Sequence, residues 1–459
     1  MAADIETATA APSRVRFVVL VFLCAAATIA YVQRSSLGVV EEVMREELKL
    51  TKEESAWVVS SGFFFTYALF QVPTGWLGHV WGSRRALALF SFIGSAATSL
   101  FAVATGFPGL VACRGAMGFS QAGLFPCAMG TIKSWFPVSQ RAFAAGPLTA
   151  CMQVGAAAGA AATGWMSDRI GWRSTFMVFS LPSLIWAVWF YLWFRDHPRD
   201  HTAVNDGELD LLGSGAAGPP ARQGADDAGP IPWGQLLLSV PLAWFCAQQF
   251  CRAAGYVFYS SWFTTYLKEA RGVESLAAAG VLTSLPLCGF GVGSLVGGWL
   301  SDWLLIRTGS RRFSRQGLAI ASQLACALFV LAAYPVRDAT LAVLIISAGS
   351  FCAAVGGPVA YAVSADIGGH HVRPVFSLMN MWGNIGAFAF PLVVPLLFGK
   401  GKQTNWDGVM ILFGAIHVAA AICWLGFNPD RPILPERAPE SPDGTKNIEL
   451  PVSNIESSE

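Results

Sequence analysis

Apolar residues in this chain form long runs instead of alternating with polar ones. A helix needs roughly 20 apolar residues to cross a hydrocarbon core of about 30 Å, and about twelve runs approach that length. Each run predicts a membrane-spanning helix, because a helix satisfies its backbone hydrogen bonds inside the lipid. The expected spans are residues 17–38, 55–77, 85–105, 108–132, 141–163, 173–194, 242–267, 276–300, 316–334, 340–365, 373–398 and 405–427.

Polar segments divide these spans into two sets of six. The longest polar stretch is rich in Gly, Pro, Asp and Ala and predicts a flexible linker without a core of its own. Lys and Arg are more numerous on the side of both termini and this linker, which the positive-inside rule predicts to be cytoplasmic. The expected parts are a cytoplasmic N-terminal tail (1–16), an N-terminal six-helix bundle (17–194), a cytoplasmic linker (195–241), a C-terminal six-helix bundle (242–427) and a cytoplasmic C-terminal tail (428–459).

One loop sequence occurs in both halves of the chain. GWLGHVWGSRR (75–85) joins the second and third expected spans, and GWLSDWLLIRTGSRR (298–312) joins the eighth and ninth. Two such repeats normally bind a substrate between them, near the middle of the membrane. In these loops glycine allows tight turns and close helix approach, while arginine either bonds to helix carboxyl ends and acids in a closed gate or sets the topology. The predicted gating residues are Gly75, His79, Gly82, Arg84, Arg85, Gly298 and Asp302, with Arg311 and Arg312.

The composition supports a polytopic membrane protein. Of 459 residues, 54% are hydrophobic and 13% are charged, about half the charged fraction of a soluble domain. The 47 glycines and 17 tryptophans suit close helix packing and anchoring at the membrane interface. A soluble enzyme, a nucleic-acid binder and a disordered scaffold are therefore disfavoured. The ten cysteines lie in apolar runs without zinc or disulfide spacing, so we interpret them as small buried hydrophobic residues.

Three arginines lie within the expected spans: Arg34, Arg114 and Arg252. An arginine at the centre of a membrane helix costs about 2.5–3.5 kcal/mol, so each is a candidate binding residue facing protein, water or a ligand. The alternative is that an arginine reaches the interface or bonds to backbone carbonyls. No Asp or Glu lies well inside a span, so an anionic ligand would supply the missing charge. Carboxylates, sulfonates and phosphates all meet that requirement.

Polar side chains in the same helices are candidates for reading the rest of the ligand. Tyr31 precedes Arg34 by one helical turn, and Gln121 follows Arg114 by two turns, so each pair shares a helix face. For each candidate, a hydrogen bond between helices or an interface anchor is the alternative. We interpret His417 as a packed core residue. The candidate ligand contacts are Tyr31, Gln33, Tyr67, Gln121, Tyr256, Tyr259, Asn380 and Asn384.

Several segments resemble the major facilitator superfamily, whose loop signature is similar to residues 75–85. The chain from about residue 16 to 427 further resembles its anion:cation symporter family, which includes bacterial sugar-acid and other organic-anion transporters. The resemblance implies an all-α membrane protein with twelve transmembrane helices in two pseudo-symmetric six-helix bundles, the major facilitator fold. The matching segments are YVQRSSL (31–37), RGAMGFSQAGLFP (114–126), SWFPVSQRAFA (134–144), SWFTTYL (261–267) and MNMWGNIGA (379–387).

The sequence departs from that family at three positions. Gln33 and Gln121 stand where the family usually has acids, and His79 replaces the acid of the loop signature. In proton-coupled relatives the two membrane acids are implied proton carriers. Gln121, with arginines in the first and seventh spans, instead resembles the organophosphate:phosphate antiporters, although Arg252 lies about one turn earlier than their arginine.

The predicted function is a secondary active transporter that moves a small organic anion, a sugar acid or another carboxylate, across the inner membrane. Arg34 and Arg114 are the predicted primary anion ligands, and Arg252 assists. An exchanger for phosphate- or sulfonate-bearing substrates, a transporter-derived anion sensor and a membrane enzyme are the alternatives. Exchange, proton entry and export remain open as coupling modes. We expect a monomer in the lipid bilayer with a small organic anion and a counter-anion or co-transported proton, without enzymatic activity, cofactor, metal or nucleic acid.

Overall fold

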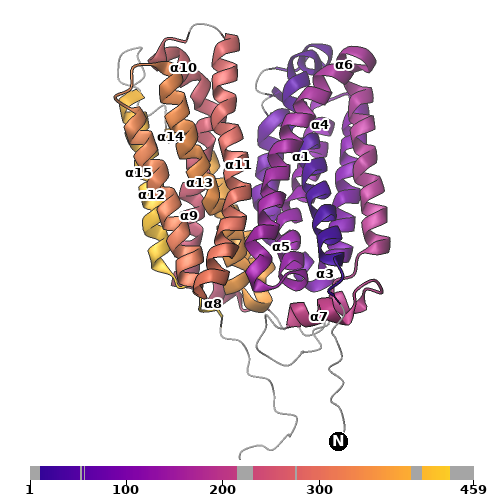
Figure 1. The fold of residues 1–459 in the computed structure, drawn as a ribbon. Coiled ribbons are helices and arrows are strands. Elements are labelled where there is room, and N and C mark those ends of the chain that lie inside the picture. The colour runs from indigo at the N-terminus through magenta and orange to yellow at the C-terminus, as the bar shows by residue number, and fades with distance from the viewer. Residues whose placement is uncertain are drawn as a thin grey trace, which may run out of the picture.

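The computed structural model describes residues 11–51, 54–55, 57–213, 231–273, 276–393 and 406–434. Every regular element in these ranges is a helix, as the long apolar runs predicted (Figure 1). Both chain ends, the Gly- and Pro-rich middle of the linker and the last residues of the expected span 373–398 lie outside the described residues.

Helix lengths show where single helices contain two membrane spans. Helix α3 (Gly62–Val103) has 42 residues and would extend about 63 Å if straight, about twice the hydrocarbon thickness. It bends at Gly82, where φ is 80°, a conformation that glycine adopts at little cost. Helix α6 (Arg141–Trp193) bends in the same way at Gly171, where φ is 78°. Each of these helices therefore forms a hairpin of two spans.

The remaining elements complete the expected pattern. Seven described segments are by themselves long and apolar enough to cross a membrane. Other spans are divided into two helices. Gly123 lies between α4 and α5, and a π-helix separates α9 from α10. The N-terminal half holds α1 (Val15–Glu47), η1 (Trp57–Ser61), α4 (Phe107–Ala122) and α5 (Leu124–Trp135); the C-terminal half holds α9 (Val240–Val257), η5 (Phe258–Trp262), α10 (Phe263–Arg271), α11 (Leu276–Thr308), η6 (Arg312–Gly317), α12 (Leu318–Ala333), α13 (Ala339–Ile367), α14 (Val372–Val393) and α15 (Trp406–Cys423).

The helices form two bundles side by side (Figure 1). One contains α1 to α6 and the other α9 to α15, so the halves of the sequence are also the halves of the fold. Large apolar side chains such as Val21, Leu192 and Leu328 are exposed on the outer surface, where lipid replaces water as the solvent. The short helices α7 (Asp206–Gly213) and α8 (Trp233–Leu237) lie at one end of the bundles, which we call the linker end.

Residues 195–213 of the linker are docked on the N-terminal half, which corrects the prediction of flexibility for this segment. Glu208 of α7 is buried and accepts hydrogen bonds from the backbone N–H groups of Val15 and Arg16, both at 3.2 Å. Its carboxylate also pairs with the Arg16 guanidinium at 2.9 Å. A carboxylate is favourable at a helix N-terminus. Nearby, His201 packs against Trp193, and burial lowers the pKa of that imidazole.

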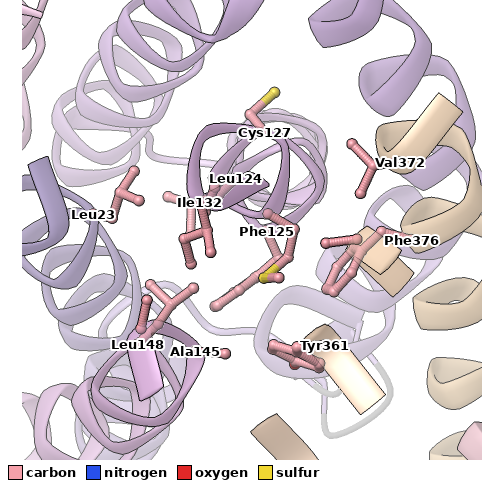
Figure 2. Close-up of a cluster of buried hydrophobic side chains, with 14 of the residues drawn as sticks. Leu23, Leu124, Phe125, Cys127, Ile132, Ala145, Leu148, Tyr361, Val372 and Phe376 are labelled. Carbon is pink, nitrogen blue, oxygen red and sulfur yellow. The ribbon is translucent and has the colours of Figure 1, made fainter. Parts of the chain in front are cut away.

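A shared apolar core joins the two halves toward the linker end. Figure 2 shows Phe125 and Ile132 from α5 in one cluster with Tyr361 from α13 and Phe376 from α14. The rings of Phe125 and Tyr361 lie 6.5 Å apart, and those of Tyr361 and Phe376 lie 4.9 Å apart. This packing removes apolar surface from both halves at once, so it stabilises a state in which the linker end is closed.

Candidate functional site

Arg34, on the first helix of the N-terminal half, is surrounded by aromatic rings from α1 and α3. The centres of the Phe63 and Phe64 rings are 4.8 and 4.7 Å from its guanidinium carbon. The rings of Tyr31 and Tyr67 are 5.3 and 5.4 Å away. Aromatic faces attract a cation without a formal negative charge. The guanidinium, which is only half-buried, therefore keeps its capacity to bind an anion.

Arg114 is fully enclosed and bonds to the backbone. Its Nε donates to the carbonyl oxygen of Val58 at 3.0 Å, and its Nη2 donates to that of Val59 at 2.9 Å. Both carbonyls belong to the π-helix η1, an element that often occurs at functional sites. The Phe63 ring lies 5.0 Å from Arg114, so this one ring contacts the guanidinium groups of both Arg114 and Arg34.

Arg252 occupies the first helix of the C-terminal half. Its Nε donates to Gln249 Oε1 at 3.0 Å, and the side chain is half-buried. A Cβ atom on Gly357 of α13 would lie 3.5 Å from Arg252 Nη1. Tyr256 follows Arg252 by one helical turn, so the two side chains share a face of α9.

Polar pairs connect the halves beside these arginines. Tyr67 accepts from Asn380 Nδ2 at 3.4 Å. Tyr256 accepts from Gln153 Nε2 at 3.0 Å. The structure thus brings Tyr31, Tyr67, Tyr256, Asn380, Arg34 and Arg252 together between the halves, with Asn384, which donates to Gln71 at 3.2 Å.

Three further residues of this central group were missed by the sequence analysis: Gln71, Gln153 and Tyr361. Their signal was a polar or phenolic side chain in an otherwise apolar run, and Gln71 follows Tyr67 by one helical turn. Tyr259, which was a candidate, is instead buried in the core of the C-terminal half. Its hydroxyl lies 3.8 Å from the sulfur of Cys326. The π-helix η5 begins at Phe258, between Tyr256 and Tyr259, and its wider turn changes the direction of the Tyr259 side chain.

Gln33 and Gln121 face the interior of the N-terminal half instead of the central group. Gln33 Nε2 donates to the carbonyl oxygen of Phe179, and Gln121 Nε2 donates to that of Ala30, both at 3.1 Å. Both side chains line a small cavity of about 20 Å³ within that half. The structure therefore does not bring these two amides together with Arg34 and Arg252, although Gln33 is adjacent to Arg34 in the sequence.

The described structure gives no carboxylate partner to Arg34, Arg114 or Arg252. Within the described ranges, none of the arginines of the three spans takes part in an ion pair. Glu41 pairs with Arg45 one turn away, and Asp366 pairs with Arg141 and Arg315 at the linker end. The central group is therefore electropositive, which agrees with the sequence prediction.

Two of the loop glycines, Gly75 and Gly298, lie at close contacts between the halves. A Cβ atom on Gly75 would lie 1.9 Å from the hydroxyl oxygen of Ser377 on α14. A Cβ atom on Gly298 would lie 2.4 Å from the carbonyl oxygen of Ala142 on α6. Both distances are far below van der Waals contact, so a larger residue at either position requires a neighbour to move, which is harder for the backbone carbonyl of Ala142 than for the side chain of Ser377.

Ion pairs close the linker end around the second loop. Asp302 Oδ2 accepts from the backbone N–H of Phe143 across the interface at 2.6 Å. Its Oδ1 pairs with the buried guanidinium of Arg315 at 2.7 Å. Arg141 pairs with Asp366 across the interface at 2.7 Å. Asp302 was a predicted gating residue, whereas Arg315, three residues after the loop pattern, was not.

The loop arginines differ in their contacts. Arg84 Nε donates to the carbonyl oxygen of Tyr191 at 2.8 Å, near the end of α6, as predicted for a helix carboxyl end. Arg85 and Arg312 are exposed. The bonded gate arginine of the second half is Arg315 instead of Arg311 or Arg312, because η6 turns position 315 into the interface.

Histidines occupy the corresponding part of the first loop. The His79 ring lies 5.3 Å from the ring of His371, which precedes α14 in the other half. Nearby, Arg373 donates to the Ser83 hydroxyl at 2.8 Å, and Lys133 donates to the carbonyl oxygen of Gly369. All hydrogen bonds and ion pairs that we find between the halves in the described ranges lie from the central group to the linker end.

Known proteins identify the class of this fold. The family model of the Major Facilitator Superfamily matches residues 23–312 and 275–456. The chain therefore belongs to the major facilitator superfamily, and it is a secondary transporter, not an enzyme. The crystallised proton:xylose symporter has the same fold, with a TM-score of 0.66 and 15% identity over 91% of this chain and 98% of its own. The fucose:proton symporter of E. coli also has this fold. Its TM-score is 0.61 and its sequence identity is 13%, with 90% of this chain and 97% of the symporter covered.

Curated relatives that cover nearly the whole chain place it among transporters of organic anions. A probable sulfoacetate transporter of Cupriavidus necator is 29% identical over 442 residues, which are 95% of this chain and 99% of the relative. A probable galactarate/D-glucarate transporter of Bacillus subtilis is 28% identical, covering 94% and 95%. A D-galactonate transporter of Escherichia coli is 28% identical, covering 90% and 97%.

Proposed function

We propose that this transporter carries a small organic anion, a sugar acid or another carboxylate or sulfonate, across the cell inner membrane by alternating access. The observation that carries the proposal is the Arg34 guanidinium, held among four aromatic rings without a carboxylate partner in the described chain. A guanidinium binds two oxygens of a carboxylate or sulfonate at once. Relatives whose substrates are sugar acids and sulfoacetate support this substrate class.

The contacts suggest different roles for the three arginines. Arg34 and Arg252 are half-buried and come from opposite halves, so we assign them the direct contacts with the anion. Arg114 is buried and bonds to the carbonyls of Val58 and Val59. We assign it a supporting role, in which it adds positive potential and holds η1. This division differs from the sequence expectation, which made Arg114 a primary ligand.

The orientation follows from the charges of the polar segments. We place the linker and both termini in the cytoplasm, in agreement with the positive-inside rule. The closed linker end then describes an outward-facing carrier, and release into the cell requires the contacts of Asp302, Arg141 and Gly298 to separate. The apolar core between α5 and α14 must separate in the same step.

The coupling mode that we propose is exchange of one anion for another. Moving a monovalent anion into a cell against 100 mV costs about 2.3 kcal/mol, so uptake needs a driving force. Gln33 and Gln121 are amides without a titrating proton and bond to backbone carbonyls. An empty electropositive site is costly to enclose away from water, which favours reorientation of the loaded carrier over the empty one.

Proteoliposomes test this function directly. Purified protein is reconstituted, and uptake of radiolabelled D-glucarate and sulfoacetate is measured with and without unlabelled anion inside the vesicles. We expect internal anion to accelerate uptake strongly and a pH gradient alone to have little effect. Rapid uptake into empty vesicles driven by the pH gradient would contradict exchange.

The arginine assignment has its own matched control. Arg34→Gln removes the charge within the aromatic group and should abolish uptake. Arg337→Gln makes the same chemical change on an exposed loop residue and should leave uptake unchanged. Equal activity of the two variants would contradict the proposed site.

A further inference from the structure

Two of the uncompensated charges belong to different halves of the molecule. Arg34 lies on α1 and Arg252 on α9, the first helix of each half, and neither forms an ion pair within the described residues. Arg252 precedes Tyr256 by one helical turn on α9, and Tyr256 bonds to Gln153 of α6 at 3.0 Å. Two residues further along α6, a Cβ atom on Gly155 would lie 3.0 Å from the Cβ of Tyr31, whose ring is 5.3 Å from the Arg34 guanidinium carbon. These contacts place the two arginines at one site between the halves.

From this arrangement we infer that the preferred substrate is a dianion with an anionic group at each end, one bound by Arg34 and the other by Arg252. The inference rests on the proposed function and specifies its substrate class. A monoanion neutralises one guanidinium and leaves the other uncompensated. A dianion neutralises both, and it links the two halves through the ligand.

Neutrality matters most when the carrier changes its orientation. The loaded site is then enclosed on both sides, and an unpaired charge away from water is strongly unfavourable. Arg114 increases this demand, because its bonds to backbone carbonyls supply dipoles but no negative charge. A substrate with two negative charges thus reduces the electrostatic cost of the enclosed state more than a substrate with one.

The residues between the two arginines are polar but uncharged. Tyr256 bonds to Gln153, and Tyr67 bonds to Asn380, and both pairs cross between the halves. Phenol and amide groups hydrogen-bond to hydroxyls without requiring a charge. The middle of the substrate is therefore expected to be neutral, either a hydroxylated chain or a short methylene unit, with the charges at its ends.

Matched ligand pairs test the inference. D-glucarate and D-gluconate share a six-carbon hydroxylated chain and differ only in a terminal carboxylate that is a hydroxymethyl group in gluconate. Sulfoacetate and isethionate differ in the same way on a two-carbon chain. Calorimetry and thermal shift on the purified, full-length protein should show that at least one dianion binds about tenfold or more tightly than its monoanionic partner.

The Arg252→Gln variant identifies which residue reads the second charge. It should weaken binding of the dianion about tenfold, toward the value for the monoanion, and change monoanion binding little. Arg337→Gln, on an exposed loop, should preserve the preference for the dianion. Thermal unfolding without ligand establishes that both variants are folded.

The outcomes separate the inference from the function on which it rests. Equal affinity for both members of every pair, or an Arg252→Gln variant that retains the full preference, overturns the dianion inference while anion transport stands. If none of the four anions binds or is transported, the proposed anion function itself fails.

Discussion

The two repeated loops occupy equivalent places at the linker end, but they close the interface by different means. In the second half, the Asp302 carboxylate bonds to Arg315 and to the backbone N–H of Phe143, near the start of α6. In the first half the same loop position is His79, whose ring lies beside His371, just before α14. A helix N-terminus attracts an anion, and only the second loop supplies one. One side of the gate is therefore joined through a carboxylate, and the other through ring packing and hydrogen bonds from Arg373 and Lys133 to uncharged acceptors.

This comparison suggests how a symmetric fold opens with limited cost. Ion pairs on one side provide specificity for the closed state, whereas the packed side separates without exposing a bonded carboxylate. Both sides retain the glycine contact, Gly75 against Ser377 and Gly298 against Ala142. The close approach is common to the two loops, and the charge is not.

Removing the charged contact should have the largest effect. Asp302→Asn removes one of the two carboxylates that pair with the buried Arg315 in the described chain and leaves Asp366, at 3.6 Å. The Asp302–Arg315 pair lies within the C-terminal half, so the contact that the closed state loses is the bond from the Phe143 N–H to the Asp302 carboxylate. Hydrogen bonds to charged groups contribute about 1.5–3 kcal/mol, so the closed linker end should lose population. Spin-label distances across the linker end, which should lengthen, measure this change. Asp210→Asn, on the exposed surface of α7, is the control, and an unchanged distance distribution in Asp302→Asn would contradict the charged gate.

Replacing Gly298 or Gly75 by alanine adds one methyl group, and we expect the two substitutions to differ in how strongly they destabilise the closed state. Gly298→Ala places Cβ against the backbone carbonyl of Ala142, which cannot rotate away, whereas Gly75→Ala meets the side chain of Ser377. Overpacking costs about 1–3 kcal/mol, and we expect Gly298→Ala to shift the carrier from the closed state further than Gly75→Ala. Cysteine accessibility at the linker end measures the shift. A larger effect of Gly75→Ala would show that Ser377 is the more rigid neighbour.

Making the first loop resemble the second should have the smallest effect. His79→Asp places a carboxylate close to Arg373 and Lys133 and near the start of α14. Charge near a helix N-terminus contributes about 0.3–1 kcal/mol, and up to about 2 kcal/mol when partly buried. We expect a more stable closed linker end and slower exchange in proteoliposomes, while His79→Asn changes both little. Faster exchange in His79→Asp would contradict the proposed packing role of this loop.

Side-chain direction explains which site residues the sequence could predict. Arg34, Arg252 and Tyr256 were recognisable because a charged or phenolic group in an apolar run needs a reason to be there. Gln33 was selected on the same ground, yet it bonds to Phe179 inside the N-terminal half. A helix turns by about 100° per residue, so the neighbour of a site residue often faces another helix.

Long-range pairing was the part that sequence patterns missed. Arg315 lies outside the repeated loop pattern, and Asp302 meets it only because η6 brings its side chain back to α11. The linker segment 195–213 was expected to be flexible from its polarity. Its docking depends on Glu208 meeting the start of α1, almost 200 residues away in the chain.

The sequence by itself determined the membrane environment, the helical spans, the two repeats and the excess of positive charge inside the spans. These properties depend on the cost of burying backbone and charged groups in lipid, which each segment carries independently of its neighbours. Only the tertiary structure decided which arginines are half-buried and which one is enclosed and bonds to backbone carbonyls. It also decided that one gate loop is charged and the other is packed, because those outcomes depend on helix rotation and on partners distant in the chain.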